Sequence, residues 1–227
     1  MEIAWALQHP NLCVGWVEAL GVTIQPSPPE FGALLDEALA RRAQQGQDEG
    51  VKQAIRDLLR VGGYKPSGRG KPASEYLAEA ASKGTFPRIN NVVDLNNLLS
   101  LETGWPMSAL DRARVLGLPG ETDERVGLVE LRFGRKDERY VFNSVGQEID
   151  LEGLVCVARR GGQAVGNPVK DAMAAKTHEQ TRDVLAALYA TRATHTEAQV
   201  LAVAQRYAEL LSEYAGALHV RAWTQTA

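Results

Sequence analysis

One stretch of the chain, residues 86–111, combines a helical stripe of apolar residues with an unusual density of amides. The apolar residues recur every three or four positions, and they are Ile89, Val92, Val93, Leu95, Leu98, Leu99 and Leu101. This spacing predicts a helix over residues 90–102 that stops at Gly104. The polar residues of the same stretch are Asn90, Asn91, Asp94, Asn96 and Asn97. Because Asn and Asp are poor choices for a helix interior, we expect their side chains to face a pocket or a neighbouring backbone.

Four more helices are predicted from the pattern. The first begins at a capping box formed by Ser27 and Glu30, and the second covers residues 49–59 and stops at the glycines that follow Val61. A short helix follows at residues 74–81. The last helix is expected to be capped by Thr194 and Glu197.

Six strands are predicted from runs that alternate or stay apolar, at residues 3–7, 12–20, 126–133, 139–142, 153–158 and 184–189. The first two are joined at His9-Pro10-Asn11, and the charged stretch 134–138 suggests a hairpin between the third and the fourth. A long loop, residues 160–182, is predicted to be functional or mobile. Helices near both ends with strands clustered later indicate an α+β fold, and no sharp boundary divides residues 1–227.

Composition narrows the class of protein. With 44% hydrophobic and 23% charged residues, the chain is typical of a soluble globular protein. It has no apolar run near the ~20 residues of a membrane span and no visible signal peptide, so a cytoplasmic protein is expected. Cys13 and Cys156 are expected to be reduced core residues. The four histidines are scattered, so we expect no metal site and no cofactor.

The charge balance argues against a strong general affinity for nucleic acid. The net charge is −3 and the isoelectric point is about 5.9, whereas nucleic-acid-binding proteins usually carry a basic balance or stripe. Local basic patches remain possible, and they are Lys65, Arg69, Lys71 and Arg88 in one group and Arg159, Arg160 and Lys170 in another. The alternative is that these residues are ordinary solvated surface charges.

The usual catalytic signatures are absent: there is no Gly-x-Ser-x-Gly elbow, no phosphate-binding loop and no His-Glu-x-x-His helix. A site that cleaves an already activated ester needs only to hold the ester and orient a water molecule. Asn96 and Asn97 suit that task, because an amide offers donors and an acceptor in fixed geometry. The turn at Pro106 is expected to bring Ser108 back to the same concave site.

The central stretch also resembles a known family. Its order of Arg-Ile-Asn-Asn-Val-Val-Asp, Asn-Asn, Gly-Trp-Pro-Met and a closing Asp is similar to the tRNA-editing domain of the phenylalanyl-tRNA synthetase beta subunit, the B3/B4 domain, and more so to its free-standing relatives. Stretches 64–76 and 157–170 extend the resemblance over about residues 61–190. It implies layers of mainly antiparallel sheet flanked by helices, in one domain with added terminal helices, and it implies tRNA with an aminoacylated 3′ end as a weak partner.

The resemblance also implies site residues. Asn97 matches the pocket asparagine of the family, whereas Asn96 stands where the family has threonine, and Ser108 stands where it has histidine. The family's glutamate for a substrate hydroxyl should fall near residues 186–188, where this chain has no acid. Further candidates for contacts with the ligand or tRNA are Arg88, Asn90, Asn91, Arg159, Arg160, Asn167 and Lys170.

Three functions stay open from the sequence. The first is a free-standing deacylase that clears a mischarged aminoacyl ester from tRNA. The second is a non-catalytic module that binds RNA or a small amino-acid-like ligand, which the missing histidine and glutamate favour. The third is a hydrolase of another amino-acid ester or amide.

Overall fold

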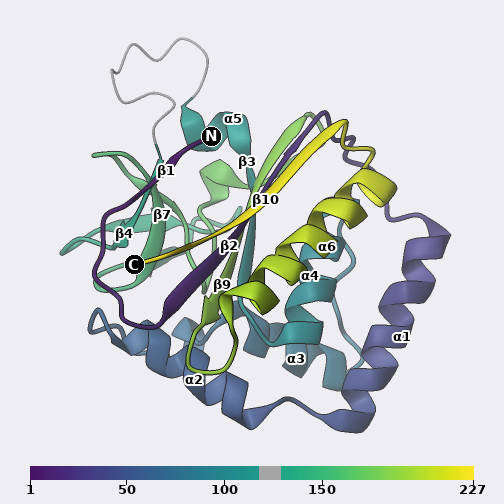
Figure 1. The fold of residues 1–227 in the computed structure, drawn as a ribbon, viewed down its shortest axis with the longest axis horizontal. Helices are drawn as coiled ribbons and strands as arrows, with labels where there is room; N and C mark the ends of the chain where they lie inside the picture. The colour runs from purple at the N-terminus through teal and green to yellow at the C-terminus, as the bar shows by residue number, and fades with distance from the viewer. Residues whose placement is uncertain (118–128) are drawn as a thin grey trace.

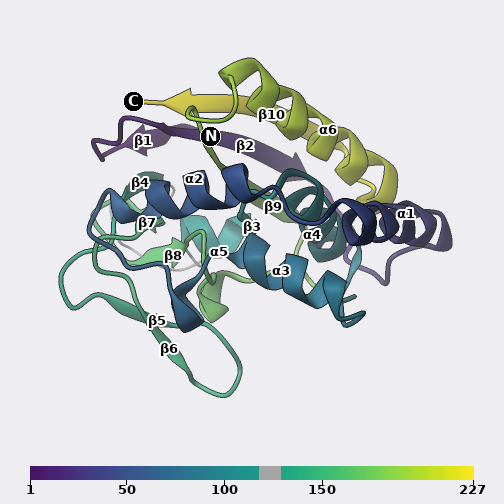
Figure 2. The same cartoon turned by 90° about the horizontal axis from the view of Figure 1, so that it is seen from below.

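Two four-stranded sheets and a layer of helices stack side by side in the computed structural model, which describes residues 1–117 and 129–227 (Figures 1 and 2). The central sheet has the order β10-β2-β9-β3 with antiparallel neighbours throughout. Its strands are β2 (Leu12–Leu20), β3 (Met107–Asp111), β9 (Asp183–Thr191) and β10 (His219–Thr226). This arrangement confirms the α+β class.

The outer sheet, on the left of Figure 1, has the order β1-β4-β7-β8. Its strands are β1 (Ile3–Trp5), β4 (Val129–Phe133), β7 (Val155–Arg159) and β8 (Ala164–Gly166). β1 runs parallel to β4, and the other two pairs are antiparallel. A separate two-stranded ribbon consists of β5 (Arg139–Val141) and β6 (Glu148–Asp150), and it projects from the body in Figure 2.

The helices are α1 (Pro29–Gln45), α2 (Glu49–Arg60), α3 (Ala73–Ser82), α4 (Asn91–Thr103), α5 (Arg112–Leu116) and α6 (Glu197–Ala215), with short 3₁₀ turns at Gly68–Gly70 and Met173–Ala175. α1, α4 and α6 cover the other face of the central sheet, whereas Val115 of α5 packs in the core between the two sheets. α1, α4 and α6 lie on the right of Figure 1, and α2 crosses one end of the stack. No helix in the described part of the chain is long and apolar enough to cross a membrane.

β2 and β9 lie between two hydrophobic cores, and this position explains why their sequences are apolar throughout. Trp16 of β2 and Tyr189 of β9 point into the core between the two sheets, whereas Val17 and Leu188 point into the core under the helices. A strand that is buried on both faces has no solvent side on which polar residues could alternate. Cys13 and Cys156 are both buried and free, as the sequence predicted.

Helix α4 begins and ends where the sequence predicted. The Asn90 side chain accepts a hydrogen bond of 3.0 Å from the Val93 N–H, which caps the first turn. Gly104 adopts the left-handed conformation with φ of 76°, and its N–H bonds to the Ser100 carbonyl. The helix is therefore fixed at both ends.

Two predicted helix starts were wrong in detail. α1 begins after Pro28 without a side-chain cap, because the Ser27 hydroxyl instead donates to the Asp94 carboxylate at 2.7 Å. α6 is capped by Thr196, which exchanges hydrogen bonds with Gln199 in a capping box two residues later than expected.

Several strand predictions also needed correction. β1 is shorter than expected and pairs in a different sheet from β2. Residues 134–138 do not join β4 and β5 into a hairpin, because Glu138 turns back to bind the Arg132 guanidinium through two bonds of 2.7 Å, and β5 pairs with β6. Residues 126–128 of the expected strand lie outside the described residues. The long loop 160–182 contains β8 and a 3₁₀ turn, and the sequence did not predict β3, β6, β10 or α5.

Candidate functional site

Helix α4 forms one wall of a cavity of about 490 Å³, which we call the asparagine pocket. The other walls come from β3, from the segment that follows β5 and from the stretch 167–177. Its lining polar residues include Asn96, Asn97, Asn167, Lys170, Asp171 and Lys176. The lining runs from Ala73 to Thr177, so the fold gathers into one hollow residues that lie more than a hundred positions apart in the sequence.

Asn97 has the most available side chain of the pocket. It is 8% exposed, and its amide makes no hydrogen bond to any residue that the structure describes. Asn96 is partly engaged, since its amide donates to the Met107 carbonyl at 3.5 Å and accepts from the Tyr207 hydroxyl at 3.4 Å. Neither atom of this amide is among the fully buried side-chain atoms that lack a partner, so both keep contact with solvent and Asn97 can bind a ligand or water in the pocket.

Asp171 brings a carboxylate into the same pocket. Its Oδ1 accepts from the Ser108 hydroxyl at 2.6 Å and from the Asn167 N–H at 3.2 Å, and its Oδ2 has no hydrogen bond within the described residues. Burial raises the pKa of Asp171 to about 6, although these two hydrogen bonds and the charge of Lys176 act in the opposite direction. An acid of this pKa exchanges a proton near neutral pH, as a general base must.

A set of hydrogen bonds holds the turn that carries Asp171. The Asn167 side-chain oxygen accepts from the Val169 N–H at 2.7 Å and from the Lys170 N–H at 2.8 Å, and its amide nitrogen donates to the Tyr140 hydroxyl. The Tyr140 hydroxyl in turn donates to the Lys170 carbonyl at 2.6 Å. Asn167 therefore both lines the pocket and positions its neighbours.

Lys170 places a positive charge at this turn. Its ammonium lies 4.2 Å from the ring centroid of Phe142 and 5.8 Å from that of Tyr76. Burial lowers the pKa of Lys170, and the charge of Arg69 lowers it further. The pocket thus holds two lysines, of which Lys170 lies against aromatic rings, together with the Asp171 carboxylate and the Asn97 amide.

All of these residues lie within a stretch that matches a known family. The model of the B3/4 domain matches residues 67–216, about two thirds of the chain, and this range includes α4, β3 and the turn at Asn167. The chain belongs to the B3/4 domain family. The match extends past residue 190, where the recognisable resemblance in the sequence ended, and takes in helix α6.

The curated relatives that this B3/4 domain protein matches are much longer chains. It is 33% identical over 63 residues to the phenylalanine–tRNA ligase beta subunits of Synechococcus elongatus and of another Synechococcus strain. The aligned stretch covers 28% of this chain and 8% of each relative. The B3/4 domain protein therefore shares a small part of these ligase subunits.

The structure gives the three predicted catalytic residues different positions. Asn96 and Asn97 both line the asparagine pocket. Ser108 is fully buried behind it, where its hydroxyl is 2.6 Å from Asp171 and 3.1 Å from the Tyr189 hydroxyl. Ser108 thus contacts the pocket through Asp171, and we now assign it a positioning role in place of direct contact with a ligand.

The predicted binding residues divide in the same way. Asn90, Asn167 and Lys170 line the pocket. Asn91 is fully buried, with its amide donating to the Thr23 and Tyr214 carbonyls and its oxygen accepting from two N–H groups, so every hydrogen-bonding site of this side chain is used internally. This corrects its assignment to ligand contact.

Three predicted arginines lie away from the pocket. Arg88 forms an exposed ion pair with Asp36. Arg159 and Arg160 lie at the turn between β7 and β8, at the opposite end of β8 from Asn167, and the Arg159 guanidinium donates to the Arg114 carbonyl at 2.8 Å. None of the three lines the asparagine pocket beside Asn97.

Sequence reasoning missed Asp171. Its signal was the turn Asn-Pro-Val-Lys-Asp, because an Asn that bonds to the N–H groups two and three residues later fixes the side chains that follow. The sequence could not show that this turn faces α4. No group of three or more metal-ligating His, Cys, Asp or Glu side chains occurs among the described residues.

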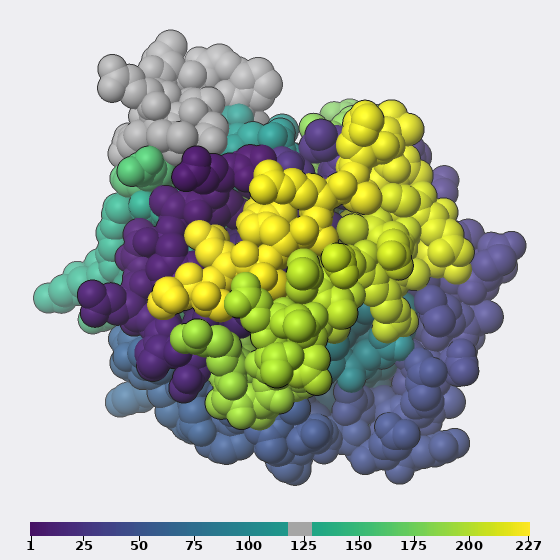
Figure 3. Space-filling view, in the orientation of Figure 1, coloured from purple at the N-terminus to yellow at the C-terminus, as the bar shows by residue number. Residues whose placement is uncertain are grey.

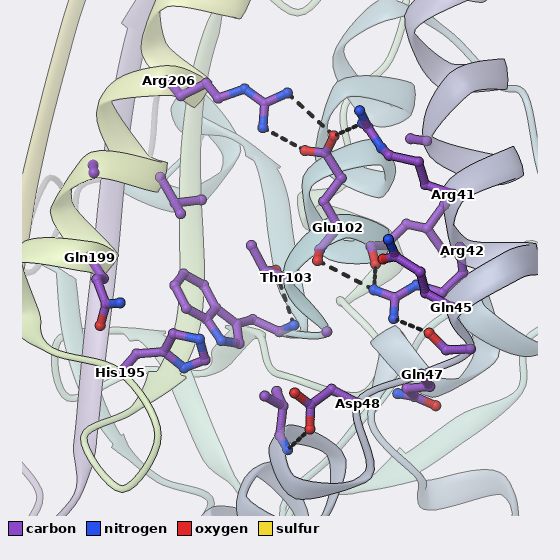
Figure 4. A pocket seen from close by; sticks show the side chains of 18 residues that line it. Arg41, Arg42, Gln45, Gln47, Asp48, Glu102, Thr103, His195, Gln199 and Arg206 are labelled. Carbon is purple, nitrogen blue, oxygen red and sulfur yellow. Dashed lines mark hydrogen bonds and ion pairs between the residues drawn. The ribbon is translucent and has the colours of Figure 1, made fainter.

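A larger cavity, of about 830 Å³, lies between α1, the carboxyl end of α4 and α6, and we call it the arginine pocket (Figure 4). Arg41 and Arg206 both point at Glu102, at 2.9 Å and 2.6 Å from its carboxylate. The Arg42 guanidinium donates to the Gly46, Leu101 and Glu102 carbonyls. These charged groups bind one another and the end of α4, so the arginine pocket is a polar joint between helices.

Proposed function

We propose that this protein binds the aminoacylated 3′ end of a tRNA in the asparagine pocket and hydrolyses a mischarged aminoacyl ester. The observation that carries the proposal is the unpaired Asn97 amide in one pocket with the Asp171 carboxylate. Membership of the B3/4 family and similarity to tRNA ligase subunits support the choice of tRNA.

The proposed chemistry uses these two groups on one water molecule and one ester. The Asp171 carboxylate takes a proton from water as its oxygen attacks the ester carbonyl. The Asn97 N–H groups donate to the carbonyl oxygen, which gains negative charge in the tetrahedral intermediate. When the bond to the ribose oxygen breaks, that oxygen receives the proton from Asp171, and a free amino acid and an uncharged tRNA leave.

Supporting residues have narrower roles in this proposal. Ser108 holds Asp171 through the hydrogen bond of 2.6 Å, and Asn167 fixes the turn on which Asp171 lies. Lys170, a cation on the pocket wall, is the candidate for the terminal phosphate. Its partly desolvated ammonium strengthens such a contact.

A panel of tRNAs charged with different amino acids tests the proposal. We expect release of one or a few amino acids by the protein, and a loss of that release in Asn97→Ala and Asp171→Asn. Gln47→Ala is the matched control, because it removes an amide from the arginine pocket. Absence of release from every charged tRNA would contradict the proposal.

The second candidate is a module that binds a small amino-acid-like ligand without cleaving it. Asp171 favours it, because a carboxylate that is mostly ionised at neutral pH also pairs with an α-ammonium group. Calorimetric titration with free amino acids separates the two functions. Binding that is lost in Asp171→Asn, without any ester cleavage, would favour the module.

A further inference from the structure

The central sheet ends in an unusually open edge at β10. This strand is eight residues long and keeps a regular register with β2 from His219 to Thr226, without a bulge. Natural edge strands are generally short, bulged or protected by charged side chains, above all lysine, or by proline. HVRAWTQT contains no lysine or proline, and Arg221 is its one residue that is charged at all physiological pH values. The opposite edge, β3, is met by a bridge between Leu110 and Lys176, whereas β10 has no such neighbour among the described residues.

The figures place this edge on the surface. β10 lies in front of β2 in Figure 1, and Figure 3 shows its atoms on the same face. Leu218, directly before the strand, is 77% exposed, and Val220 is 40% exposed. The edge therefore combines unpaired backbone groups with two exposed apolar side chains.

The ladder shows which backbone groups are unpaired. The backbone N–H of Arg192, just after β9, donates to the carbonyl of Asn11, just before β2. Because alternate residues of an antiparallel strand bond to opposite neighbours, the odd-numbered residues of β2 bond to β9 and the even-numbered ones bond to β10. In the register with β2, the partners of those even-numbered residues are His219, Arg221, Trp223 and Gln225. The N–H and C=O groups of Val220, Ala222 and Thr224 consequently point outward.

A second copy of the strand complements this edge. An antiparallel pair related by a two-fold axis through Ala222 brings the outward groups of Val220 opposite those of Thr224 in the other copy. The same register places Arg221 opposite Trp223 of the other copy, and Arg221 already lies 4.8 Å from the ring centroid of its own Trp223. Each cation then faces an aromatic ring, and no like charges lie opposite each other.

We propose that two copies of the protein associate through β10, with their central sheets joined into one continuous antiparallel sheet centred on Ala222. Pairing satisfies the outward backbone groups of both strands and covers Leu218 and Val220. The proposal concerns a surface remote from the asparagine pocket and does not depend on the function proposed for it.

Sedimentation velocity of the full chain tests the association. We expect wild type at micromolar concentration to have twice the chain mass of 24.7 kDa, and Ala222→Pro to have the chain mass alone. Proline is tolerated where an edge N–H points away from the sheet, so the ladder to β2 is retained, and a melting curve checks the fold. A wild-type protein that stays at the single-chain mass up to high concentration would overturn the proposal.

Cysteine cross-linking tests the register, and it remains informative if Ala222→Pro does not fold. Ala222→Cys places two thiols opposite each other across the axis, at the ~5.5 Å Cα separation that suits a disulfide. We expect a covalent dimer under mild oxidation for Ala222→Cys and none for Thr224→Cys, whose counterpart is Val220. The native cysteines are buried and stay unreactive. Equal cross-linking of both variants would contradict the two-fold register.

Discussion

The asparagine pocket and the arginine pocket lie at two places along the same helix and differ in what their polar groups do. In the arginine pocket, Glu102 binds Arg41 and Arg206, and Arg42 covers the last carbonyls of α4. In the smaller asparagine pocket, the Asn97 amide and one oxygen of Asp171 have no partner among the described residues. The comparison teaches that unused hydrogen-bonding capacity identifies a site better than volume does, because a ligand gains little from groups that already have partners.

The comparison predicts its largest effect at Asn97. If this amide stabilises the tetrahedral intermediate, Asn97→Ala should lower kcat/KM for ester hydrolysis by roughly 10²–10³-fold. Its stability should change little, since the side chain has no hydrogen bond to lose within the described structure. Deacylation kinetics and urea unfolding measure the two quantities. A stability loss with unchanged kcat/KM would mean that Asn97 is structural and that the pockets are alike.

The ionised Asp171 carboxylate is predicted to destabilise the fold at neutral pH. Its pKa is raised by folding from 3.8 to about 6, so folding favours the neutral acid, and the stability that this provides is complete below pH 4 and lost as pH rises through 6. Two units correspond to about 3 kcal/mol. We therefore expect Asp171→Asn to gain about 2–3 kcal/mol in unfolding free energy, relative to wild type, between pH 4 and pH 7.5.

Urea unfolding at the two pH values measures that gain. In kinetics, kcat/KM of wild type should rise about tenfold per unit below pH 6 and level off above it, and Asp171→Asn should remove this dependence. Ser108→Ala provides a matched comparison, because it removes the hydrogen bond that favours the ionised form and should shift the kinetic pKa upward. If Asp171→Asn is less stable than wild type at pH 7.5, the raised pKa assigned to Asp171 is contradicted.

Substitutions in the arginine pocket should lower stability and leave kcat/KM unchanged, which is the opposite of the effect expected at Asn97. Arg42→Ala leaves the carbonyls at the end of α4 without their charged donor and should lower the free energy of unfolding by about 2 kcal/mol. The matched variant Arg41→Ala removes only partly exposed ion pairs and should cost less than ~1 kcal/mol. Both should keep wild-type kcat/KM under conditions where they are folded. If Arg42→Ala lowers kcat/KM under conditions where the variant is fully folded, the arginine pocket is itself a functional site.

The sequence predicted α4 well because its signals are local. The apolar stripe, the Asn90 cap and the Gly104 stop all lie within fifteen residues, and the pocket role expected for Asn97 followed from the same stretch. The roles of Asp171 and Ser108 come from their contact with each other, and these two residues are 63 positions apart in the sequence. No local pattern encodes such a contact. β10 was missed for a related reason, since its alternating, mostly polar residues gain their order from pairing with β2 at the other end of the chain.

The smallest predicted effect separates Lys170 from Arg160, which the sequence analysis placed in one basic group. Lys170 lines the asparagine pocket, whereas Arg160 lies at the far end of β8. If the 3′ end of a tRNA docks at the pocket, Lys170→Ala should reduce the slope of log K against log salt by about 0.7, the value for one phosphate of a single strand. Arg160→Ala should leave the slope unchanged, and Asn97→Ala should spare binding while lowering hydrolysis, because phosphate contacts position the RNA and the amide acts on the ester. Filter binding over a salt series measures the slopes.

If Lys170→Ala and Arg160→Ala reduce the slope equally, the RNA lies along β8. If no tRNA binds at low salt, the small-ligand module becomes the better account of the pocket.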